Sequence, residues 1–122
     1  MTHLRLTRRR PRPRVDYSEM LWVQLNMAQP ALEKCREYKF HPVRLWRLDL
    51  AFEREKLAVE IEGFGPGGTA GRHQRMAGFT ADCEKYAELA IAGWRLIRVT
   101  TAQVRSGQAL TWIERALGLR RP

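Results

Sequence analysis

The chain has 122 residues, 44% of them hydrophobic, and its 22 lysines and arginines against 13 acids give a formal net charge of +9. This length predicts one domain with a modest core, and the charge favours a polyanionic partner, most commonly nucleic acid. No run approaches the roughly 18 apolar residues of a membrane helix, the basic N-terminus lacks the apolar segment of a secretory signal, and no basic amphipathic helix suggests a membrane surface. We therefore expect a cytoplasmic protein whose cysteines, Cys35 and Cys83, are reduced and at least partly buried.

Residues 1–15 are predicted to form a flexible basic arm, and residues 16–122 a single domain. Pro11 and Pro13 would interrupt any helix in the arm. Its arginines either contact nucleic-acid phosphates or form a solubilising leader, and we favour the first interpretation. The candidate contacts are Arg8, Arg9, Arg10 and Arg12.

The domain begins with a predicted helix, for which Ser18 is a plausible N-cap and which Pro30 ends. Three strands are expected next, over residues 37–40, 44–52 and 57–63.

Residues 63–79 hold six of the nine glycines, so a flexible loop is expected there, carrying Arg72, His73 and Arg75 as possible phosphate contacts. Thr80 can cap the next helix, which Gly93 would end. A strand over 94–100 and an amphipathic helix over 106–117 complete the order α-β-β-β-α-β-α. This order predicts an α/β fold with a mixed central sheet flanked by helices, because the helix between two strands suggests a crossover.

The strands over 44–52 and 57–63 form a hairpin whose register can be predicted. If Phe52 faces Leu57 across the turn, Asp49 faces Glu60, and directly opposite side chains share a face of the sheet. One face then carries the apolar side chains Leu50, Phe52, Leu57, Val59 and Ile61. The other carries Asp49, Ala51, Ala58, Glu60 and Glu62.

The second face places like charges opposite each other, which destabilises a sheet. Two carboxylates about 5 Å apart repel by roughly 3 kcal/mol at an effective dielectric constant near 20. Mg²⁺ would remove this repulsion, since it takes oxygen ligands from one or two carboxylates, water and substrate phosphate, and the small Ala51 and Ala58 would leave room for a substrate backbone. Alternatively, Asp49 and Glu60 are solvated or paired with arginines such as Arg44, Arg47 or Arg98.

The run WRLDLAF, a short turn and LAVEIEG together resemble the core of the PD-(D/E)XK nuclease superfamily. In this resemblance Asp49 matches the first acid, Glu60 the second, and Glu19 the glutamate that many members carry on the first helix. The segment DCEKYAELAIAGWRLIRVT resembles the helix and strand that follow the core. The likeness covers residues 16–104 and is greatest to small phage and bacterial endonucleases, including those similar to archaeal-type Holliday junction resolvases and very-short-patch repair endonucleases.

The chain departs from the superfamily pattern at Glu62, which stands where lysine is usual. Glu62 would then be a third metal ligand or a supporting group. Lys85, on the following helix, is the candidate replacement for the missing cation. Its alternative role is that of a solvated lysine paired with Glu84 or Glu88.

The resemblance implies a restriction-endonuclease-like fold and a Mg²⁺-dependent DNA endonuclease, with Mn²⁺ expected to substitute. Asp49, Glu60 and the carbonyl of Ile61 would hold the metal, Lys85 would orient or deprotonate a water, and Arg72 or His73 could grip the phosphate.

The expected substrate is a four-way DNA junction in a bacterial or phage-infected cell, cut symmetrically by a homodimer. Apolar residues of the first and last helices could form the dimer interface, namely Leu21, Trp22, Trp112 and Leu117. The alternatives are a repair endonuclease that nicks duplex DNA and a non-catalytic DNA-binding module.

Overall fold

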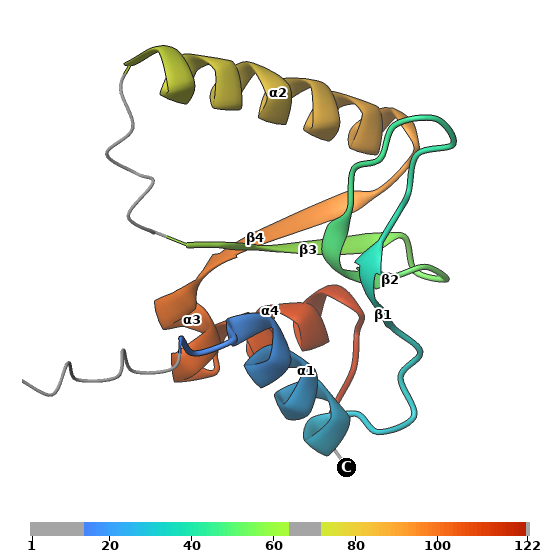
Figure 1. The fold of residues 1–122 in the computed structure, drawn as a ribbon. Helices are drawn as coiled ribbons and strands as arrows, with labels where there is room; N and C mark the ends of the chain where they lie inside the picture. Colours follow the sequence, from blue (N-terminus) through green and yellow to red (C-terminus); the bar gives the residue numbers. More distant parts are fainter. Residues whose placement is uncertain (1–13, 64–71, 122) are drawn as a thin grey trace, which may run out of the picture.

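The computed structural model describes residues 14–63 and 72–121 (Figure 1). The chain is α/β, with a four-stranded mixed sheet and helices on both of its faces. Its elements in chain order are α1 (Tyr17–Ala28), β1 (Cys35–Tyr38), β2 (Leu48–Phe52), β3 (Leu57–Glu62), α2 (Arg72–Ile91), β4 (Arg95–Thr100), α3 (Thr101–Ser106) and α4 (Gln108–Ala116).

The strands follow one another across the sheet in the order β1-β2-β3-β4. The first three are antiparallel neighbours, and β4 runs parallel to β3 after the crossover that contains α2. Leu50 pairs with Val59 and Phe52 with Leu57. The predicted hairpin register and the predicted mixed sheet are therefore confirmed.

The larger core lies between the sheet and the layer formed by α1, α3 and α4 (Figure 1). The predicted apolar face of the hairpin supplies its sheet side, since Leu50, Phe52, Leu57 and Val59 are all buried there. Leu21 and Leu25 from α1 and Ile113 from α4 pack against them. The alternation of apolar side chains along β2 and β3 thus fixes which face the three helices cover.

A smaller core fills the opposite face, beneath the C-terminal part of α2. Ala51 and Ala58 are fully buried there beside Leu89 of α2 and Trp94. The expectation that these alanines leave room for a substrate backbone is wrong. Their small side chains instead allow Leu89 and Trp94 to pack closely on the sheet.

Two element boundaries differ from the sequence prediction before the hairpin. Asp16 caps α1 in place of Ser18, because its Oδ1 accepts a hydrogen bond of 3.0 Å from the Glu19 amide. The second strand begins at Leu48 and not at residue 44. The His41 ring explains this, since its Nδ1 accepts from the amides of Val43 and Arg44 and bends the chain.

Two further boundaries differ after the hairpin. The helix α2 begins at Arg72, within the stretch expected to be a loop, and Thr80 lies inside it. The Thr80 hydroxyl donates to the Met76 carbonyl at 2.9 Å, so it bonds to the preceding turn and does not cap the helix. The predicted helix over 106–117 corresponds to α4, and the short helix α3 before it was not predicted. Gly107 separates the two helices, and its φ of 86° lies in the left-handed region that favours glycine.

Both cysteines are free and exposed, so the prediction of buried or partly buried thiols is wrong. Within residues 14–63 and 72–121, no helix has the length and apolar character needed to cross a membrane.

Candidate active site at the β2–β3 hairpin

The acidic cluster is built by the start of β2 and the end of β3. The confirmed register places Asp49 opposite Glu60, and alternation along the strands turns both carboxylates toward the α2 face of the sheet. Asp49 Oδ2 accepts a hydrogen bond of 2.7 Å from the Ile61 amide. This bond fixes the Asp49 carboxylate against the neighbouring strand.

Glu60 is a buried acid, 8% exposed, and its partner comes from α2. Lys85 Nζ lies 2.9 Å from Glu60 Oε1 and also donates to the Arg47 carbonyl at 2.7 Å. Leu89 lies one helical turn after Lys85 and is anchored in the smaller core. Core packing and two hydrogen bonds therefore hold the Lys85 ammonium beside the Glu60 carboxylate.

Glu60 is buried close to the negative charge of Asp49, and both conditions affect its pKa. Burial, together with the nearby charge of Asp49, raises the pKa of Glu60 from 4.5 to about 7. The Lys85 ammonium opposes this rise in pKa but does not cancel it. Lys85 pairs with Glu60, so the alternative in which it pairs with Glu84 or Glu88 is wrong.

Glu62 is held by a different set of contacts. Its Oε1 lies 3.0 Å from Arg98 Nε and accepts a hydrogen bond of 3.4 Å from the Tyr86 hydroxyl. Burial and the charges of Glu60 and Glu62 raise the pKa of Tyr86. Arginine pairing was the alternative for Asp49 and Glu60, but among the described side chains Glu60 pairs with Lys85 and Asp49 accepts from a backbone amide. It is Glu62 that pairs with Arg98.

The donor set fits a hard divalent cation. Carboxylate oxygens are the ligands that Mg²⁺ prefers, and the mutual repulsion of Asp49 and Glu60 is what a cation between them would relieve. Among the side chains that the structure describes, no three His, Cys, Asp or Glu residues form a metal-binding group. Protein ligands would therefore be Asp49, Glu60 and the Ile61 carbonyl, with water and substrate phosphate completing the shell.

The remaining predicted residues lie elsewhere or outside the described side chains. Glu19 forms an ion pair with Arg36 of β1, on the α1 side of the sheet. Arg8, Arg9, Arg10 and Arg12 lie outside the described residues. Arg72, His73 and Arg75 belong to the first turns of α2, not to a loop, and their side chains are not described.

The residues expected to form a dimer interface mostly pack in the core of the chain itself. Leu21 is 1% exposed in the larger core, so its assignment to an interface is wrong. Trp22, Trp112 and Leu117 are partly buried and pack against the same core.

Two contributors to the site were missed by sequence reasoning, namely Tyr86 and the Arg47 carbonyl. Tyr86 is next to Lys85 in the sequence, and its proximity to β3 depends on how α2 crosses the sheet. A backbone carbonyl has no sequence signal at all. Only the tertiary structure could reveal either contact.

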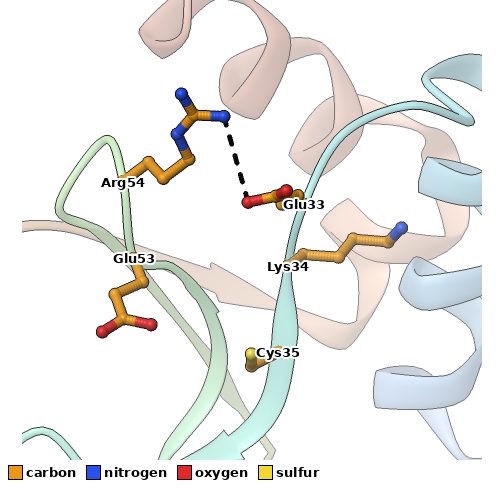
Figure 2. A pocket seen from close by; sticks show the side chains of 5 residues that line it. All are labelled: Glu33, Lys34, Cys35, Glu53 and Arg54. Atoms are coloured by element: carbon orange, nitrogen blue, oxygen red, sulfur yellow. Dashed lines mark ion pairs between the residues drawn. The ribbon is translucent and has the colours of Figure 1, made fainter.

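A hollow lies at the other end of the hairpin, near the β2–β3 turn (Figure 2). In this hollow Arg54 faces Glu33 at 4.0 Å, and the Cys35 side chain lies nearby. Its lining residues are Glu33, Lys34, Cys35, Glu53 and Arg54. The mixed charges and the single thiol offer no evident chemistry, so the carboxylate cluster is the stronger candidate site.

Comparison with known proteins returned no matching family model, no matching curated protein and no matching solved structure.

Proposed function

We propose that the chain is a metal-dependent, structure-selective DNA endonuclease, most specifically a Holliday junction resolvase resembling the PD-(D/E)XK superfamily. One observation carries the proposal: the Lys85 ammonium lies 2.9 Å from Glu60, which shares its site with Asp49. Two acids and one lysine are the groups that the superfamily core contributes, and here Glu60 contacts Lys85 and is influenced by Asp49. The order of strands and the crossover through α2 also support the proposal.

In the proposed mechanism, Asp49 and Glu60 would hold Mg²⁺ together with the Ile61 carbonyl. The bound ion would supply Lewis-acid stabilisation of phosphate charge and a water of lowered pKa. The Ile61 amide fixes Asp49 through its 2.7 Å hydrogen bond, so this ligand is oriented before substrate arrives. Lys85 is placed to orient the attacking water or to stabilise negative charge on the phosphate.

DNA is the proposed substrate because the chain carries a net charge of +9 while its candidate site is acidic. Basic residues outside the site would contact phosphates and position the backbone, without reading the base sequence. Two symmetric cuts in a four-way junction need two active sites, so the proposal includes a two-fold homodimer.

The test is a strand-scission assay on a labelled four-way junction and on a linear duplex of the same sequence. Paired symmetric nicks at the junction in Mg²⁺, absent in EDTA, are expected. Cutting confined to linear or mismatched duplex would assign the chain to duplex nicking instead. Tight binding without cutting in Mg²⁺ or Mn²⁺ would leave only a DNA-binding module.

A further inference from the structure

The segment that links β1 to β2, residues 39–47, is rich in aromatic and basic side chains and is hereafter the β1–β2 loop. It contains no helix or strand, yet three of its aromatic side chains, Phe40, His41 and Trp46, pack on one another. The Phe40 and Trp46 rings stack with centroids 6.1 Å apart and planes inclined by 12°. The His41 ring meets the Trp46 ring edge-on at 5.3 Å. The aromatic cluster thus gives the loop a small core of its own.

Polar contacts brace this aromatic cluster against α2. The Arg44 guanidinium lies 4.1 Å from the centroid of the Trp46 ring and 3.3 Å from the Glu84 carboxylate. His41 Nε2 lies 3.5 Å from the Glu88 carboxylate, while its Nδ1 accepts two backbone amides. The loop is therefore preorganised, and a partner would not need to order it on binding.

The same loop exposes two apolar side chains. Val43 is 79% exposed and Leu45 is 77% exposed, on either side of Arg44. Lys39 and Arg47 of the loop are exposed as well. A braced loop that turns two aliphatic side chains outward among cations has the composition of a wedge, which enters a stack of bases while cations contact the phosphates.

The position of the loop relates it to the carboxylate cluster. Its last residue, Arg47, accepts the Lys85 hydrogen bond through its carbonyl, and Asp49 follows two residues later. Leu45 precedes Asp49 by four residues, so their Cα atoms lie within about 14 Å of each other, the limit of an extended chain. This limit corresponds to about four base steps along DNA.

We propose that the β1–β2 loop is a wedge that unstacks bases of a DNA branch within a few nucleotides of the cut, with Val43 and Leu45 entering the stack. This inference rests on the proposed function and specifies how branched DNA would be distinguished from linear duplex. Bases at a branch are already less constrained than in duplex, so unstacking them costs less. The cations of the loop and its closeness to the acidic site favour DNA over a lipid surface as the partner.

The test uses a four-way junction with 2-aminopurine at the branch, whose fluorescence rises when the base unstacks. Uncut complexes are formed with the Asp49→Asn variant as the parent protein. The wedge variant adds Val43→Ser and Leu45→Ser, and a matched control adds Val23→Ser and Met27→Ser, which replaces exposed apolar residues of α1. All four substituted positions are exposed, so folding should be retained, and thermal melts check this.

We expect a several-fold rise in fluorescence with the parent and the control, and no rise with the wedge variant. Affinity should fall less than about tenfold, because phosphate contacts supply most of it. A rise that persists in the wedge variant, or its absence with the parent, would overturn the proposal. The proposal would also be overturned if the only defect of the wedge variant were that it no longer sedimented with phosphatidylserine vesicles. The fluorescence signal does not require strand cutting. If the wild-type protein failed to cleave DNA, that result would count against the proposed nuclease function and not against base unstacking by the loop.

Discussion

Lys85 and Glu60 are 25 residues apart in the sequence and join at 2.9 Å, one on α2 and the other on β3. The contact places a cation from the crossover helix beside two acids of the hairpin. A surface pair of this kind would have little energetic weight, but here both side chains are largely buried, at 15% and 10% exposure. A buried charged cluster is costly to stability, which is the cost expected of a site kept for chemistry.

The charges around Glu60 should be measurable through its titration. In the metal-free protein we expect carbon-13 NMR to show that the pKa of Glu60 is about 7. Asp49→Asn should lower this pKa by removing a negative neighbour, and Lys85→Met should raise it by removing a positive one. Shifts of the opposite sign would show that the cluster is arranged differently.

Glu60 should also make stability depend on pH. Its folded-state pKa of about 7 exceeds the ordinary value of 4.5. Between these values the folded protein keeps a proton that the unfolded chain has released, so stability is lost as pH rises through this window. Relative to Glu60→Gln, the wild type should lose about 3 kcal/mol between pH 4.5 and 7.5. Urea unfolding at both pH values measures the difference, and parallel pH profiles would contradict it.

The two acids of β3 should differ in their effect on cleavage. Glu60→Gln removes a proposed metal ligand and should reduce the cleavage rate about a thousandfold. Glu62 already pairs with Arg98 and Tyr86, so Glu62→Gln should reduce the rate less than about tenfold, as expected of a supporting group. Single-turnover assays at saturating Mg²⁺ compare them. Equal losses would place Glu62 among the ligands.

Leu89 should be the main apolar anchor of α2. It is 1% exposed in the smaller core, and Leu89→Ala should lower the free energy of unfolding by about 2–4 kcal/mol. Ile91, on the same helix, is 78% exposed, so Ile91→Ala should change it by less than about 0.5 kcal/mol. Similar values for the two variants would mean that α2 is not anchored as described.

The hairpin register could be predicted from the sequence because the alternation of apolar side chains and the length of the turn constrain one another. It also singled out Lys85, whose placement beside Glu60 depends on the crossover. The start of α2 was missed because glycine density was averaged over residues 63–79, although residues 72–79 contain only Gly78.

The helix α3 had a readable signal that was overlooked. Thr100 and Gln103 form a capping box, in which each side chain bonds the backbone of the other residue. The bracing of the β1–β2 loop by Glu84 and Glu88 had no such signal, because it joins segments about forty residues apart.

The most direct test of the central claim is the Mg²⁺ dependence of junction cleavage by the wild type, Asp49→Asn and Glu33→Gln. Glu33 is an exposed acid remote from the cluster and serves as the matched control. We predict that wild type and Glu33→Gln cut with the same Mg²⁺ dependence. Asp49→Asn should bind the junction but cut it about a thousandfold more slowly. Cutting by Asp49→Asn at the wild-type rate would contradict the assignment of the carboxylates to a metal site.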